Sequence, residues 1–331
     1  MLNKAMIMAA GVGSRLGALS NVMPKPLVPL ANIPVMDIIV NHLKNAGIEG
    51  IIANTYYKAD DIIRHYKNDS VMNFIKEVEL SGTAGGMKKC QFFFDKGTDF
   101  IVLSGDGLSD IDIDKAYESH KKSGSIATLV LKEVKKEQVS LYGIVVPDKE
   151  GYVLSFQEKP SIEEARSCLA NTGIYIFNYE IFDFIPENTF YDFAKNVFPA
   201  ILHSGKKINT FVMEGYWSDI GSLTQYKQSN FDIMNKCIKS FVPQVATVPN
   251  GNYLLGRNVE LSDKVNFEGN CIVGNNCKIG KNVKLVDSIL WGNVEIFDNV
   301  TIENSIVLSD LKVKESLKDK IHSDSMLSSS I

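Results

Sequence analysis

A period of six residues near the C-terminus constrains the fold of this 331-residue chain more than any other feature. From residue 259 an apolar residue recurs at every sixth position, and a second apolar residue follows it two positions later. The first set is Val259, Val265, Cys271, Cys277 and Val283, and the second is Leu261, Phe267, Val273, Ile279 and Leu285. Asparagine precedes four of the first set, the register slips by one near Ile289, and the pattern resumes at Val294. This hexapeptide period predicts a left-handed parallel β-helix at residues 241–314.

Further expectations concern cysteine, assembly and the chain end. Cys271 and Cys277 fall at wall positions, so we expect them to be buried as small hydrophobic residues rather than to bind a metal. A short stack of coils has open ends and flat apolar flanks that another protomer can cover, which predicts a homo-oligomer formed through the β-helix. Residues 315–331 are polar and serine-rich, and we expect a flexible tail there.

The N-terminal part of the chain places a loop of small residues directly after a short buried strand. The apolar run at residues 5–8 leads into the sequence AAGVGSRLGALSNVMPKPLVP. Small residues let bare backbone N–H groups approach an anion, because no Cβ blocks the way. The dinucleotide fingerprint needs glycine where Leu16 stands, and a Walker A loop is absent. Arg15 and Lys25 add positive charge that suits a triphosphate and its pyrophosphate leaving group. We expect the side chain of Lys25 to be exposed on the loop.

Predicted strands and helices alternate after this loop. Pro34 begins a helix that Gly47 ends, and strands follow at residues 48–54 and 74–78. The alternation predicts an α/β domain at residues 1–240, with a Rossmann-like, mostly parallel sheet and helices on both faces. Ligands of such sheets bind beyond the carboxyl ends of the strands, where the small-residue loop would lie.

A carboxylate and a glycine-rich segment are further candidates for chemistry. The buried strand at residues 100–103 is followed by Ser-Gly-Asp-Gly, so Asp106 would point into the ligand crevice. A carboxylate there suits a hard divalent cation held together with phosphate oxygens. The segment GTAGG, which starts at Gly82, would open a helix and bring bare backbone close to a flat ring.

The pattern AAGVGSRL followed by PKPL resembles the signature of the sugar-1-phosphate nucleotidyltransferases. GTAGG, the EKP at residues 158–160, the NTGIY from Asn171 and the WSDIG from Trp217 follow in the order typical of that family. The resemblance covers residues 4–236. It implies an enzyme that converts an NTP and a sugar 1-phosphate into an NDP-sugar and pyrophosphate, with Mg²⁺ as cofactor.

The resemblance also implies a role for each matching residue. The residues implied in catalysis are Arg15, Lys25, Asp106 and Asp219, and the last two would bind Mg²⁺. The residues implied in nucleotide binding are Ala9, Ala10, Gly11, Gly13, Ser14, Arg15, Gly82, Thr83 and Gly105. The residues implied in sugar-phosphate binding are Gly143, Glu158, Lys159, Asn171 and Thr172.

Several substrate pairs and two other kinds of function stay open. The LSGTAGG run and the short hexapeptide domain resemble mannose-1-phosphate guanylyltransferases, so GTP with mannose 1-phosphate is the predicted pair. UTP, ATP or dTTP with glucose 1-phosphate is the alternative. A non-catalytic regulatory subunit of the same architecture would be expected to lack the lysine or an aspartate, whereas Lys25, Asp106 and Asp219 are present. Acetyltransfer by the β-helix has no candidate base, because no histidine lies within the predicted coils.

Composition argues against several other classes of protein. The formal net charge of −4 disfavours a nucleic-acid binder. No apolar run approaches the roughly 20 residues of a membrane span, and the start of the sequence does not resemble a signal peptide. Five scattered cysteines without a C-x-x-C pair predict a reducing, cytoplasmic environment.

Overall fold

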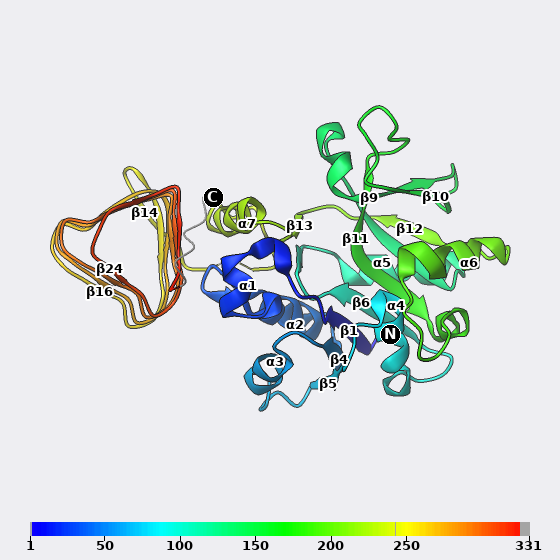
Figure 1. Ribbon diagram of the computed structural model, residues 1–331. Coiled ribbons are helices and arrows are strands. Elements are labelled where there is room, and N and C mark those ends of the chain that lie inside the picture. Colours follow the sequence, from blue (N-terminus) through cyan, green and yellow to red (C-terminus); the bar gives the residue numbers. More distant parts are fainter. Residues whose placement is uncertain (1, 242, 325–331) are drawn as a thin grey trace. The chain divides into compact units, whose positions relative to one another are not determined.

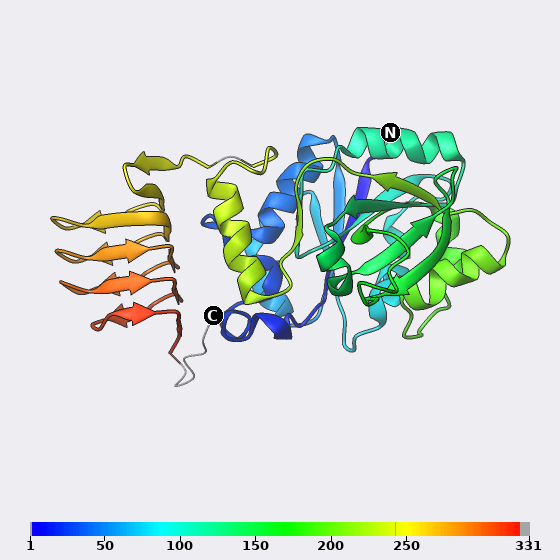
Figure 2. The ribbon, with the colours of Figure 1, turned by 90° about the horizontal axis from the view of Figure 1, so that it is seen from above.

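The structure, a computed structural model, describes residues 2–241 and 243–324. The chain divides into two compact units (Figures 1 and 2). The first unit consists of the residues up to Val12 together with Ile39–Asp219. The second unit consists of Gly13–Ile38 together with the residues from Ile220 onward. The small-residue loop therefore begins in the first unit and continues in the second.

A nine-stranded sheet forms the centre of the first unit (Figure 1). Its order is β10-β9-β11-β6-β1-β4-β5, with β8 beside β11 and β12 beside β8. The strands are β1 (Lys4–Ala9), β4 (Gly50–Thr55), β5 (Met72–Lys76), β6 (Asp99–Ser104), β8 (Ala127–Glu133), β9 (Gly143–Pro147), β10 (Val153–Glu158), β11 (Leu169–Asn178) and β12 (Asn209–Val212). The helices along this part of the chain are α2 (Val35–Asn45), α3 (Ala59–His65), α4 (Gly82–Lys89), α5 (Ile113–Ser123) and α6 (Phe198–His203).

The two halves of this sheet differ in strand direction. Strands β6, β1, β4 and β5 run parallel, as the alternation predicts, whereas β11 runs antiparallel to β6, β8 and β9. The predicted α/β fold class is confirmed. Aromatic side chains fill the core on one face, where the ring of Phe100 stacks on Phe94 at 4.0 Å and on Phe182 at 5.5 Å between centroids. The parallel half carries the loops of interest at its carboxyl edge.

The second unit joins a hairpin of the N-terminal loop to a helix and to the C-terminal coils. Its non-coil elements are η1 (Ser14–Leu16), α1 (Ala18–Val22), η2 (Lys25–Leu27), β2 (Pro29–Leu30), β3 (Ile33–Pro34) and α7 (Leu223–Met234). Tyr226 on α7 is fully buried, donates its hydroxyl to Pro29 O at 2.8 Å and accepts from Trp291 Nε1 at 2.9 Å. Asn32 Nδ2 donates to Val273 O at 2.9 Å. The hairpin therefore packs directly on α7 and on the coils.

The C-terminal residues form stacked coils, which Figure 1 shows along their axis and Figure 2 from the side. The strands are β14 (Ala246–Val248), β15 (Gly251–Leu255), β16 (Glu260–Leu261), β17 (Asn266–Val273), β18 (Lys278–Ile279), β19 (Lys284–Val286), β20 (Ile289–Leu290), β21 (Glu295–Ile296), β22 (Thr301–Glu303), β23 (Ile306–Val307) and β24 (Lys312–Val313). Neighbouring coils pair in parallel. Facing side chains lie 18 residues apart between Asn258 and Asn276 and 17 apart between Asn276 and Asn293. This change explains the slip in the sequence period, and the predicted β-helix is confirmed.

Asparagine sets the corners of these coils. Asn258, Asn276 and Asn293 have φ angles of 55°, 58° and 60°, a left-handed conformation that asparagine tolerates well. Their side chains form a ladder in which each amide donates to the next at 3.1 Å. Cys271 and Cys277 are fully buried, as predicted, and burial raises the pKa of the Cys271 thiol to about 11.

The coils continue past residue 314, where the sequence predicts their end. Strand β25 (Leu317–Lys318) pairs with β22, and β26 (Ile321–His322) pairs with β23. The prediction of a flexible tail from residue 315 is wrong for these two strands, because Ile321 is fully buried and adds another layer to the wall. Residues 325–331 lie outside the described residues.

Candidate active site

The ends of β1 and β6 meet at the carboxyl edge of the parallel half. Gly105 N donates to Met8 O at 2.9 Å, and a Cβ at Gly105 would lie 2.9 Å from that oxygen. Glycine is therefore required for the two backbones to approach this closely. The contact brings Gly105, the residue before Asp106, next to Ala9 at the start of the small-residue loop, and both Ala9 and Ala10 are buried.

A two-stranded ribbon brings Asp106 and Asp219 together. Strand β7 (Gly107–Ser109) starts directly after Asp106 and pairs with β13 (Trp217–Asp219), so that Asp219 faces Gly107. Burial raises the pKa of Tyr142, and the nearby charge of Asp219 raises it further. Within the described residues no group of three or more His, Cys, Asp or Glu side chains converges. Two carboxylates fit Mg²⁺, which usually keeps water and phosphate oxygens as its other ligands.

A buried carboxylate anchors two of the loops at this edge. Glu77, which follows β5 and is 5% exposed, accepts from Asn54 Nδ2 at 2.7 Å through Oε1. Asn54 Oδ1 in turn accepts from Ala9 N at 3.2 Å. The other oxygen, Oε2, accepts from Ser81 Oγ and from Lys89 Nζ, the latter at 3.0 Å. Glu77 therefore links the loop after β1 to the segment that opens α4.

The GTAGG segment forms the start of α4 and packs against residues 191–193. Gly82 has φ +78°, and a Cβ there would collide with the carbonyl of Tyr191, so only glycine fits. The N–H of Ala84 donates to that same carbonyl at 3.0 Å. Thr83 Oγ1 donates to Asp192 Oδ2 at 2.9 Å. Gly82 and Thr83, both predicted to bind the nucleotide, are therefore in contact with residues 191–192 of the first unit.

The second half of the small-residue loop belongs to the second unit. Gly11 is exposed at the end of the first half, and the side chains of Ser14 and Arg15 are exposed in η1. Lys25 is only 8% exposed, so the prediction of an exposed loop lysine is wrong. A Cβ at Gly13 would lie 3.0 Å from Cβ of Lys25, which shows that the lysine stem packs directly on this glycine.

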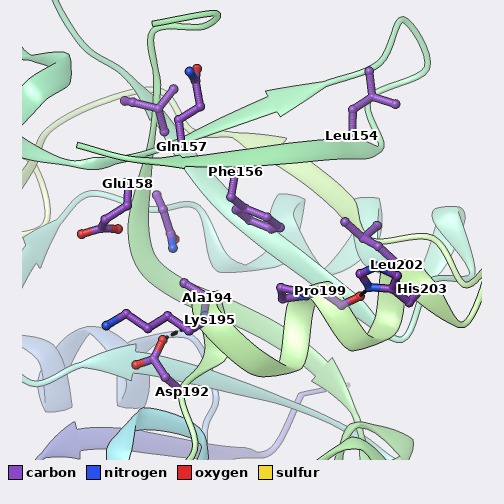
Figure 3. A pocket seen from close by; sticks show the side chains of 13 residues that line it. Leu154, Phe156, Gln157, Glu158, Asp192, Ala194, Lys195, Pro199, Leu202 and His203 are labelled. Atoms are coloured by element: carbon purple, nitrogen blue, oxygen red, sulfur yellow. Dashed lines mark hydrogen bonds between the residues drawn. The ribbon is translucent and has the colours of Figure 1, made fainter. Parts of the chain in front are cut away.

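A cavity of about 890 Å³ in the first unit gathers three of the predicted sugar-phosphate residues (Figure 3). Gly143, Glu158 and Asn171 line it. Gly143 on β9 pairs with Glu158 on β10, and Asn171 Nδ2 donates to Tyr175 Oη at 3.0 Å. The other lining residues are Ile144, Leu154, Phe156, Gln157, Asp192, Ala194, Lys195, Pro199, Leu202 and His203.

Thr172 and Lys159 are placed differently from these three. Thr172 is 5% exposed and donates its hydroxyl to Val130 O at 2.7 Å, so it stabilises the pairing of β11 with β8 instead of facing the cavity. The register of β11 shifts between Asn171 and Ile174. Because of this irregularity, the neighbouring side chains of Asn171 and Thr172 have different surroundings. Lys159 lies beside the cavity with its Nζ 4.0 Å from Glu158 Oε1.

Sequence reasoning missed Asn54, Glu77, Asp192 and Lys195. Asp192 caps the turn at Phe193–Val197, because its Oδ1 accepts from Ala194 N at 3.0 Å and from Lys195 N at 3.2 Å. Lys195 extends from this turn on the side where Glu158 lies (Figure 3). An aspartate directly before a helical run was a usable signal, since aspartate is a favoured N-cap.

Comparisons with known proteins agree with this arrangement. The family model described as nucleotidyl transferase matches residues 4–236. The chain belongs to this family. A UTP–glucose-1-phosphate uridylyltransferase from Synechocystis sp. is 37% identical over 289 residues, which cover 82% of this chain and 74% of that protein. A glucose-1-phosphate adenylyltransferase from Clostridium perfringens is 30% identical over 255 residues, which cover 70% of this chain and 64% of that protein.

A solved structure is also similar in fold to this sugar-1-phosphate nucleotidyltransferase. The crystal structure of HddC from Yersinia pseudotuberculosis aligns with a TM-score of 0.60 at 28% identity, and covers 69% of this chain and 98% of that one. The predicted family and enzyme class are confirmed. In the described part of the nucleotidyltransferase, no helix is long and apolar enough to cross a membrane.

Proposed function

We propose that the protein transfers a uridylyl group from UTP to glucose 1-phosphate and releases pyrophosphate. The observation that carries this choice is the 37% identity over 82% of the chain with a UTP–glucose-1-phosphate uridylyltransferase. It favours the alternative of the sequence analysis over GTP with mannose 1-phosphate. Adenylyl transfer to glucose 1-phosphate is the second candidate, supported by the 30% identity with a glucose-1-phosphate adenylyltransferase.

The cavity residues are proposed to bind the sugar phosphate. Glu158 accepts hydrogen bonds from sugar hydroxyls, and the amide of Asn171 offers both a donor and an acceptor. Gly143 leaves room for the sugar ring, because it has no side chain to fill the cavity beside Glu158. Lys159 supplies a cation for the phosphate group.

The loop residues are proposed to bind the triphosphate. Backbone N–H groups from Ala9 to Ser14 hold phosphate oxygens, and Arg15 and Lys25 balance the negative charge of the triphosphate and the sugar phosphate. An oxygen of the sugar phosphate attacks the α-phosphorus in line. The bond from the α-phosphorus to its bridging oxygen breaks, and pyrophosphate leaves with the electron pair. No covalent enzyme intermediate is needed.

Asp106 and Asp219 are proposed to hold Mg²⁺. The ion would neutralise phosphate charge as it develops during the transfer. Asp106→Asn or Asp219→Asn should therefore lower kcat by at least about a hundredfold with little loss of stability. Asp114→Asn, at an exposed carboxylate on α5, is the matched control and should keep wild-type turnover. Near wild-type turnover of either active-site variant in Mg²⁺ would remove the metal assignment.

A substrate panel tests the proposed reaction. Pyrophosphate release is measured with UTP, ATP, GTP, CTP and dTTP, each combined with glucose 1-phosphate and with mannose 1-phosphate. We expect UTP with glucose 1-phosphate to give the highest kcat/KM. A better pair with another base or sugar would overturn the specific choice while leaving the reaction class intact. Absence of release with every pair would favour the non-catalytic regulatory subunit.

A further inference from the structure

We propose that Thr83 positions the sugar-phosphate pocket instead of binding the nucleotide. This inference rests on the proposed function and deepens it. It reassigns a residue of the predicted nucleotide set and gives Lys195, which sequence reasoning missed, a part in binding the sugar phosphate.

The hydroxyl of Thr83 is already used by protein partners. Its Oγ1 donates to Asp192 Oδ2 at 2.9 Å and accepts from Phe193 N at 3.0 Å. A hydroxyl has a single proton to donate. The contact with Asp192 therefore leaves Thr83 with no donor for a nucleotide base.

Backbone contacts hold the same two segments together on either side of Thr83. Tyr191 N donates to Ser81 O at 2.8 Å, and Ala84 N donates to Tyr191 O at 3.0 Å. Because Gly82 carries no Cβ, the carbonyl of Tyr191 can reach the start of α4. Main-chain and side-chain hydrogen bonds together therefore hold the start of α4 against residues 191–193. The absence of a side chain at Gly82 allows this close approach.

Asp192 lines the cavity and connects Thr83 to the turn that follows. One of its carboxylate oxygens faces Thr83, and the other accepts from the N–H groups of Ala194 and Lys195. The turn that follows, Phe193–Val197, is a π-helical turn, a conformation often found at functional sites. Thr83 thus fixes the rotamer of the side chain that starts this turn.

Lys195 is the cation that the turn presents to the cavity. Its side chain is exposed, lines the cavity and has no ion-pair partner among the described residues. In Figure 3 it extends on the side of Glu158. A lysine next to a hydroxyl-binding carboxylate matches a ligand that carries both hydroxyls and a phosphate. We therefore assign Lys195 to the phosphate of the sugar 1-phosphate.

The test separates the two substrates kinetically. Thr83→Val removes the hydroxyl at nearly constant volume, and it should raise the KM for the sugar phosphate about tenfold, as expected when a charge-assisted hydrogen bond is lost. The KM for the NTP should change less than about twofold on the same reasoning. Thr83→Ser should restore the sugar-phosphate KM, and Thr98→Val, an exposed threonine elsewhere in the first unit, controls for the loss of a surface hydroxyl.

A double-mutant cycle tests the route through the turn. Lys195→Met should raise the sugar-phosphate KM by itself, and adding Thr83→Val to it should have a much smaller effect than in the wild type. Fully additive effects would overturn the route through Lys195. If Thr83→Val does not fold, Thr83→Ala removes the same hydroxyl without adding apolar surface.

Two results would overturn the role of Thr83. One is a rise in the KM for the NTP that equals or exceeds the rise for the sugar phosphate. The other is a Thr83→Val variant with both KM values unchanged in an active enzyme. Failure of the proposed function is recognised separately, because the wild-type protein would then release no pyrophosphate with any substrate pair.

Discussion

Replacing Glu77 with glutamine tests the buried network beneath the candidate nucleotide loop. Oε1 would still accept from Asn54, but an NH₂ group would replace the oxygen that accepts from Ser81 and Lys89. A hydrogen bond to a charged group contributes about 1.5–3 kcal/mol, and an unsatisfied buried donor costs about 1–3 kcal/mol. Lys89 is about one-third exposed (36%), so water partly compensates its loss. We expect the free energy of unfolding to fall by about 2–3 kcal/mol.

The assay for Glu77→Gln combines stability with kinetics. For a unit of this size the expected loss lowers Tm by about 4–12 °C, measured by scanning calorimetry. The KM for the NTP should rise severalfold, because loss of the bonds from Ser81 and Lys89 lets residue 77 move, and with it the Asn54 side chain that accepts from Ala9 N–H. Glu79→Gln is the matched control, since Glu79 is exposed two residues away and should change stability by less than about 0.5 kcal/mol. A Glu77→Gln variant with the Tm and NTP KM of the wild type would refute this account.

Further predictions concern Lys25, Asp99 and the coils. Lys25→Met keeps the buried stem against Gly13 and should lower kcat at least about a hundredfold with an unchanged Tm, whereas an equal loss of Tm would mean a structural role. Burial opposes ionisation of Asp99, but hydrogen bonds from His120 and Asn178 outweigh it and lower the pKa of that carboxyl. Its contribution to stability is therefore present above the ordinary pKa and is lost as pH falls below about 4. Melting curves should show a weaker acid loss for Asp99→Asn, and an identical pH profile would exclude this contribution. Truncation after Cys237 should give a smaller species by light scattering if the coils mediate self-association, and an unchanged oligomer would contradict it.

Residues that act through local geometry were predictable from the sequence. Asp106 lies two residues after the buried strand β6, and the ends of parallel strands meet at one edge, so its position follows from the strand. The positions of the corner asparagines were likewise predictable from the six-residue period, because each coil repeats the same local conformation. In both cases the information lies within a few neighbouring residues.

Residues that act through strand order were not predictable. Asn54 contacts Ala9 only because β4 pairs with β1 in the register that aligns Asn54 with Met8. Glu77 reaches Asn54 only because β5 lies next to β4. Thr172 faces β8 because the register of β11 shifts there, and no pattern in NTGIY predicts that shift. Such contacts depend on the assembled sheet.

The hydroxyl of Tyr226 has a consequence for how this protein can be recombined with its relatives. It joins Pro29, near the lysine of the N-terminal loop, to Trp291 of the coils. A chimera that exchanges only the C-terminal coils would keep the hydrogen bond from Tyr226 to Pro29. The bond from Trp291 to Tyr226 and the bond from Asn32 to Val273 would then depend on residues of the relative. The cassette that can be exchanged is discontinuous in sequence and comprises Gly13–Ile38 together with everything from Ile220 onward. Grafts cut at the three boundaries before Gly13, after Ile38 and before Ile220 should keep all the contacts of the hairpin with α7 and the coils, whereas a single cut between α7 and the coils should not.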